Sequence, residues 1–160
     1  MAETLGSLVD KLSIKNLRIW HLDEALEDEE TSVSKLQELQ AKRDLADSQR
    51  QELVKEIDNF LGAALRGEVR IRDEKIKMYT NTNVSSSETI KALGNAVSEL
   101  ACRNIKLWHL EDEVRRTDLP DATIVQTKRK IDATNQERND LIDKVDQILS
   151  KHSLTSKGAD

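Results

Sequence analysis

The chain has 160 residues, with 25 basic and 30 acidic side chains and a net charge of −5. One domain accommodates this length, and the few glycines and prolines argue against an all-β fold built on many tight turns. The acidic balance argues against a general nucleic-acid binder, the single cysteine excludes an internal disulfide, and no apolar run is long enough to cross a membrane.

The first predicted element is a helix that begins near Leu5. Its apolar residues recur at intervals of three or four, which places them on one face of a helix. Asn16 and Asp23 continue this face where apolar side chains are expected. Trp20 flanks the same face, and we expect it to be a packing anchor.

A second helix follows after a short turn. Thr31 or Ser32 fits its N-cap, because a hydroxyl accepts hydrogen bonds from the free N–H groups of a first helical turn. Its apolar face ends near Leu61 and includes one cation, Arg50. The two helices are predicted to form a hairpin of about residues 5–61.

A linker of about residues 65–88 connects this hairpin to the second half of the chain. Loops of this length are uncommon inside a compact domain unless they connect two helix ends that lie far apart. A crossover supplies that distance, because the third helix would then begin at the end opposite to where the second one finishes. We therefore predict that the two hairpins are inverted relative to each other, with a long crossover between helices 2 and 3.

The second half, about residues 93–149, repeats the first at a constant offset of 88 residues. The only two tryptophans, Trp20 and Trp108, fall on equivalent positions, and so do His21 and His109. Two copies are too few for a solenoid. The repeat therefore predicts an all-α four-helix bundle, made of two duplicated helical hairpins with pseudo-twofold symmetry.

Six polar residues stand on the predicted apolar faces. A buried charge without a partner is costly, so the charged ones should pair. With inverted hairpins, the expected pairs are Asp23 with Arg138 and Glu111 with Arg50, flanking two asparagines. Either these pairs only fix the register of the bundle, or they line a polar pocket whose arginines bind a carboxylate or phosphate. The candidate ligand-binding residues are Asn16, Asp23, Arg50, Asn104, Glu111 and Arg138.

A second stripe on the first and third helices combines each histidine with an acid three residues later. It contains His21 with Glu24, and His109 with Asp112. Imidazole and carboxylate both bind divalent metals, but ferritin-like sites use the reverse order, and the second and fourth predicted helices contribute no histidine. Surface hydrogen bonding or a dimer contact is therefore preferred, and no metal or cofactor is predicted.

Two motifs stand out in the second half: WHLED at residues 108–112 and NQER at residues 135–138. They resemble the motifs of a bacterial family of helical proteins of unknown function. The first half is similar to the other half of that family, so the two halves stand in swapped order, as after a circular permutation. Genes of that family often lie near glycosyltransferase genes of surface-polysaccharide synthesis, and the resemblance implies such a context.

Two functions are compatible with the sequence. The first is a non-catalytic helical interaction or assembly protein, with a homodimer or another protein partner. The alternative is a binder or enzyme for a small anionic, sugar- or nucleotide-linked ligand, whose anion the arginines bind while the acids orient it or accept a proton. The sequence does not decide whether the chain is an enzyme. A single cytoplasmic domain over residues 1–160 is expected, because no signal region is evident, with a disordered tail over residues 151–160.

Overall fold

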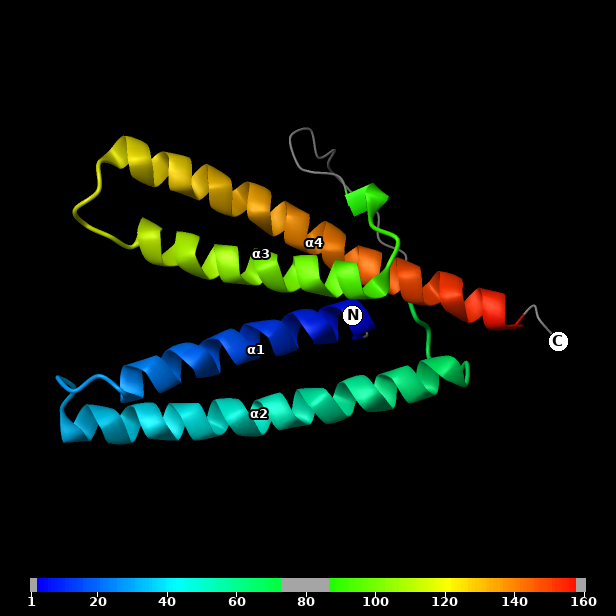
Figure 1. Cartoon of the computed structure of the whole chain (residues 1–160), viewed down its shortest axis with the longest axis horizontal. Coiled ribbons are helices and arrows are strands. Elements are labelled where there is room, and N and C mark those ends of the chain that lie inside the picture. The colour runs from blue at the N-terminus through cyan, green and yellow to red at the C-terminus, as the bar shows by residue number, and fades with distance from the viewer. Residues whose placement is uncertain (1–2, 73–86, 158–160) are drawn as a thin grey trace.

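The computed structural model describes residues 3–72 and 87–157, and it is all-α in this part of the chain. Four helices form two hairpins, and a short 3-10 turn (η1, Ser87–Thr89) precedes the third helix (Figure 1). The predicted all-α four-helix fold is confirmed. The helices are α1 (Leu5–Leu26), α2 (Val33–Leu65), α3 (Leu93–Val114) and α4 (Asp121–Lys157).

Local sequence explains where these helices begin and end. Thr4 and Ser7 form a capping box, in which the Ser7 amide donates to the Thr4 hydroxyl at 3.3 Å and the Thr4 amide donates to the Ser7 hydroxyl at 3.0 Å. Of the two predicted caps of α2, Ser32 is used, because its hydroxyl accepts from the Lys35 amide at 3.4 Å. Gly67 follows the end of α2 with a φ of 74°, a left-handed conformation that glycine adopts without strain.

The fourth helix is the longest of the described part of the chain. Pro120 precedes it, at a position where no backbone N–H is needed, and its carbonyl accepts from the Ile124 amide at 3.1 Å. The helix continues through Lys157, into the segment for which a disordered tail is predicted, and residues 158–160 lie outside the described residues. No described helix combines the length and apolar character needed to cross a membrane.

The two hairpins point the same way (Figure 1). The α1–α2 turn and the α3–α4 turn lie at one end of the molecule, so α1 runs parallel to α3. The predicted inversion of the hairpins is therefore wrong. The end of α2 and the start of α3 both lie toward the other end, so their connection does not have to run the length of the bundle as the predicted crossover would.

The hairpins meet where the first turn of α1 lies against α4. The Gly6 amide donates to the carboxylate of Asp146 at 2.7 Å, and Asp146 is fully buried. Glycine is required at this position because a Cβ would collide with the backbone carbonyl of Ile142. One turn later, the Asn104 side-chain amide donates to the Asp10 carboxylate at 2.8 Å and joins α3 to α1. These contacts fix the register of one hairpin against the other.

The main apolar core lies at the end remote from the turns. Its buried side chains come from α1, α3 and α4, and the C-terminal part of α2 adds partly buried ones. Toward the turns, a second buried cluster belongs to the α3–α4 hairpin alone. The buried residues of the main core are Leu5, Ala96, Val145, Ile148 and Leu149.

The bundle is open on one side. Helix α1 packs against all three other helices, whereas α2 packs mainly on α1. Trp20 lies on α1 at the opening between α1 and α3 and is 65% exposed, so its predicted role as a packing anchor is wrong. Its repeat equivalent, Trp108, stacks instead on His21 of α1, with ring centroids 4.4 Å apart.

Candidate functional site

A cavity of about 280 Å³ lies between α1, α3 and α4. Helix α1 contributes apolar side chains to its wall, and α3 and α4 contribute most of the polar ones. The exposed side chains of Asp112 and Arg115 line it as well, so the cavity opens to solvent. Its polar or aromatic lining residues are Asn104, Trp108, Glu111, Asp112, Arg115, Asn135 and Arg138.

Arg138 is the most unusual residue of this wall. Its Nε atom is buried and has no hydrogen-bond partner in the described part of the chain. A buried guanidinium N–H without an acceptor is costly, because arginine keeps its charge and cannot escape by losing a proton. The Arg138 side chain also lines the cavity.

Glu111 brings an acidic group to the same cavity. It is half-buried, and among residues 3–72 and 87–157 it makes no hydrogen bond or ion pair. Asp112 lies beside it at the rim and approaches Arg115, with 3.5 Å between Oδ1 and Nη1. The cavity is therefore lined by a carboxylate and a guanidinium that have no partner among the described residues, with a loose ion pair at the entrance.

The indole of Trp108 forms an aromatic part of the wall. His21 stacks on it from α1 with an angle of 6° between the two ring planes, and its Nδ1 atom lies 2.8 Å from the Glu24 carboxylate. The carboxylate thereby holds the imidazole in place. The second predicted stripe is thus divided: His21 and Glu24 support the wall, Asp112 lies at the rim, and His109 is exposed.

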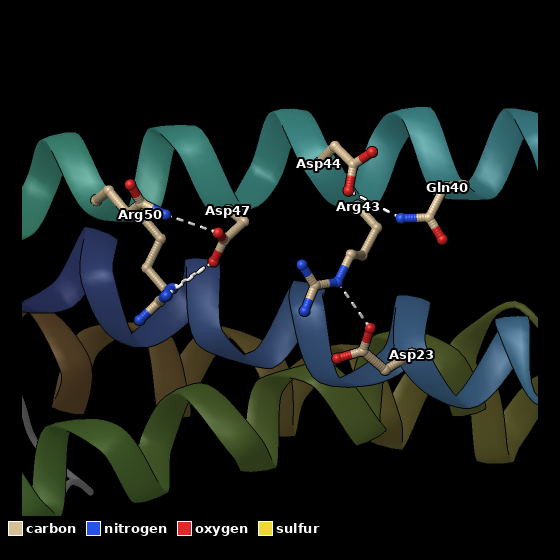
Figure 2. Close-up of polar contacts among 7 residues, drawn as sticks. Asp23, Gln40, Arg43, Asp44, Asp47 and Arg50 are labelled. Atoms are coloured by element: carbon tan, nitrogen blue, oxygen red, sulfur yellow. Dashed lines mark hydrogen bonds and ion pairs between the residues drawn. The ribbon is translucent and has the colours of Figure 1, made fainter.

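In the first hairpin, the corresponding polar residues pair locally (Figure 2). Arg43 donates to Asp23 at 3.0 Å, and Arg50 donates to Asp47 of its own helix at 3.0 Å and 2.8 Å. The hydrogen bond to Asp23 raises the pKa of Arg43, and the hydrogen bond from Arg50 lowers the pKa of Asp47. Because the Asp23 side chain is 45% exposed, its pair belongs to the surface.

Both predicted crossed pairs, Asp23–Arg138 and Glu111–Arg50, are therefore wrong. The physical reason is the parallel arrangement of the hairpins (Figure 1). Asp23 and Glu111 both lie near the turns, whereas the two arginines both lie farther along their helices. Opposite charges would meet across the hairpins only if one hairpin were reversed.

The two predicted asparagines also differ in their surroundings. Asn104 is 3% exposed, donates to the buried Asp10 and lines the cavity, whereas Asn16 is exposed. The cavity thus unites three of the six candidates, Asn104, Glu111 and Arg138. The equivalent residues of the first hairpin do not line it. No group of three or more histidine, cysteine or acidic residues in the described part of the chain is arranged to hold a metal ion.

A family model for proteins of unknown function, DUF4254, matches residues 1–72 and 94–159. The chain belongs to the DUF4254 family. The predicted membership of a family of unknown function is confirmed, and the two matched segments coincide with the two hairpins of the repeat. The swapped order of the halves stays a prediction. No curated protein and no solved structure matches this DUF4254 chain.

Two polar residues of the DUF4254 cavity were missing from the sequence candidates, although the sequence contains signals for both. Asn135 precedes Arg138 by three residues, and Arg115 follows Glu111 by four. Residues at these spacings lie on the same side of a helix, so each shares a face with a candidate. Neither residue interrupts an apolar stripe, so the spacing of apolar side chains does not single them out.

Proposed function

We propose that this DUF4254 protein binds a small ligand with a carboxylate or phosphate group in the cavity between α1, α3 and α4. The observation that carries the proposal is the buried Nε atom of Arg138, which has no acceptor among the described residues although its side chain lines the cavity. An anionic oxygen bound in the cavity is attracted to the positive charge of this guanidinium, which no described residue neutralises. The planar guanidinium also suits the paired oxygens of a carboxylate or phosphate.

The other lining residues favour a ligand with hydrogen-bond donors beside its anionic group. Glu111 supplies an unpaired carboxylate, which accepts from a hydroxyl or amine, and Asn135 supplies both a donor and an acceptor. Sugar phosphates and nucleotides combine these properties. The gene context of the family that the motifs resemble, surface-polysaccharide synthesis, makes them the first ligands to test. If the ligand is a substrate, Glu111 is the group placed to accept a proton.

The other function compatible with the sequence is an interaction or assembly protein whose internal charges only set the register of the helices. A dry interior with every charge paired would support that function. The surroundings of Arg138 and Glu111 favour ligand binding, because both side chains line a cavity that opens to solvent and they do not pair with each other.

Thermal unfolding in the presence of added compounds tests the proposal. The compounds are inorganic phosphate, acetate, sugar phosphates and nucleotides. A compound at a hundred times its dissociation constant should stabilise the folded chain by about 2.7 kcal/mol, which raises the melting temperature by roughly 5–10 °C. Absence of any shift at millimolar concentrations would count against a ligand site.

Arg138→Met makes the test specific. The variant should remain folded without ligand, because methionine fills a similar space and removes the unsatisfied N–H group. It should also lose the ligand-induced rise in melting temperature. Arg129→Met, on an exposed position of α4, is the matched control and should retain the full rise. A rise that survives in Arg138→Met would place the anion somewhere else.

A further inference from the structure

The residues of the contact between α1 and α4 have repeat equivalents on α3 and α2, and within one chain these equivalents do not touch each other. In the second hairpin, α4 receives the start of α1, where Gly6 lies against Ile142 and donates to Asp146. At the repeat offset of 88 residues, Val54 corresponds to Ile142 and Asp58 corresponds to Asp146. Helix α2 therefore carries the equivalents of the two α4 residues that contact Gly6, and we call Val54 and Asp58 the receiving pair.

The chain also carries the part that would dock there. Gly94, at the start of α3, is the repeat equivalent of Gly6, and apart from its chain neighbours and the nearby backbone of its own helix no described atom lies within 4 Å of the place where its Cβ would stand. Gly94 and Asp58 are both exposed, and Val54 is 41% exposed. Both halves of the second contact are present, and both are uncovered.

The receiving pair lies on the open side of the bundle. Glu52 and Glu56 of α2 line a groove on one side of α1. Helical spacing places Val54 and Asp58 on the other side of the line along which α2 meets α1. On that other side, Trp20 lines an apolar groove of about 430 Å³ between α1 and α3.

We call this surface the open face and define it by five exposed residues. Three of them are apolar, and a monomeric protein rarely gathers large exposed apolar side chains in one patch. Ile105 is 45% exposed and lines the same groove as Trp20. The open face consists of Trp20, Val54, Asp58, Gly94 and Ile105.

The register of the hairpins also suits the contact. The bonds from Arg43 to Asp23 and from Lys15 to Gln49 set the level of α2 against α1, and counting along both helices from them puts Asp58 level with the first turn of α1. The start of α3 lies at the same end of the molecule (Figure 1). The two halves of the uncovered contact thus lie at similar heights along the bundle.

We propose that a second copy of this chain docks on the open face, so that Gly94 of each copy packs against Val54 and Asp58 of the other. Helices α2 and α3 lie on opposite sides of α1. A twofold axis parallel to the helices therefore brings α3 of one copy over α2 of the other, and the two run antiparallel, as α1 and α4 do. The contact forms twice, as a twofold dimer requires. This assembly is independent of the proposed ligand.

Light scattering across a range of protein concentrations tests the dimer. The unaltered chain should dimerise, and Gly94→Leu should make it monomeric, because the larger side chain occupies the space of the approaching helix. Asp58→Ala should weaken the dimer by at least about tenfold in dissociation constant, through loss of a charged acceptor. Gln126→Leu, on an exposed position of α4 outside the open face, should leave the dimer unchanged.

A cysteine pair distinguishes a second copy from closure of the bundle on itself. Asp10 and Asn104 are hydrogen-bonded to each other within one chain. Their repeat equivalents, Ser98 and Asn16, are exposed, and they should meet between the two copies of the dimer. In a Cys102→Ser background, a chain with Ser98→Cys mixed with a chain with Asn16→Cys should form a disulfide-linked pair on mild oxidation. A monomer at the highest soluble concentration, a dimer unaffected by Gly94→Leu, or an internal link in a chain with both cysteines would overturn the proposal.

Discussion

Gly6 and Gly94 occupy equivalent positions of the repeat in different surroundings. A methyl group on Gly6 would collide with the backbone of Ile142, so α1 would have to move away from α4. Gly6→Ala should therefore lower the free energy of unfolding by about 1–3 kcal/mol. Gly94→Ala should instead raise it by roughly 0.5–1 kcal/mol, because alanine favours a helix where nothing obstructs it.

Urea denaturation of both glycine variants, at concentrations too low for association, measures this difference. The control is internal, because the two substitutions are chemically identical. Similar effects at the two positions would contradict the close contact between α1 and α4.

At the scale of elements, the bond between Asn104 and Asp10 connects α3 to α1 across the hairpins. Asn104→Ala would leave the Asp10 carboxylate buried without its amide donor, which should reduce the free energy of unfolding by about 1–3 kcal/mol. Asn16→Ala, at the exposed equivalent position, should change it by less than about 0.5 kcal/mol. Chemical denaturation of the pair decides the matter: a loss in Asn104→Ala no larger than that in Asn16→Ala would show that Asp10 finds another donor.

The helices themselves were predictable from the sequence, but their partners were not. Apolar spacing and caps such as Ser32 depend on neighbouring residues, so the sequence reveals them directly. Asp23 and Arg50 were expected to be buried because they interrupt an apolar stripe. The stripe of the first hairpin is only partly covered, however, and its charges pair at the surface with Arg43 and Asp47. Periodicity identifies an apolar face without showing what will cover it.

At the scale of the whole molecule, the repeat predicts equal surroundings for its two copies, and the structure breaks that equality. The α1 helix docks in the second hairpin through Gly6 and Asp146, whereas α3 makes no corresponding contact with α2. The candidate cavity is therefore lined by Glu111 and Arg138 and not by their repeat equivalents, Asp23 and Arg50. Three of the six candidates line this cavity, and the sequence could not distinguish them from the other three because the relative positions of the hairpins decide which residues meet.

Acid should destabilise the molecule through ion pairs spread over its surface. Donated hydrogen bonds lower the pKa of several carboxyl groups, including Asp47 beside Arg50 and Glu38 beside Lys42. The stabilisation of the folded state by each of these carboxylates is complete above the ordinary pKa of the group, 3.8 for Asp47 and 4.5 for Glu38. It is lost as the pH falls through the lower pKa of the folded state.

The melting temperature should therefore decrease as the pH falls below these ordinary values. High salt should reduce the dependence, because exposed pairs are screened. Asp47→Asn should melt at a lower temperature than the unaltered chain at neutral pH, and the two melting temperatures should converge in acid. A melting temperature that rises on acidification would contradict the signs of these shifts.

The unequal surroundings of the two tryptophans give the protein a built-in optical probe. Trp20 is 65% exposed on the open face, whereas Trp108 is half-buried, stacked on His21 and in the wall of the cavity. Their fluorescence should therefore separate into a red, readily quenched component from Trp20 and a bluer, protected component from Trp108. One spectrum would then report on both surfaces: a second copy would shield the first component from quenchers, and a small molecule in the cavity would alter the second.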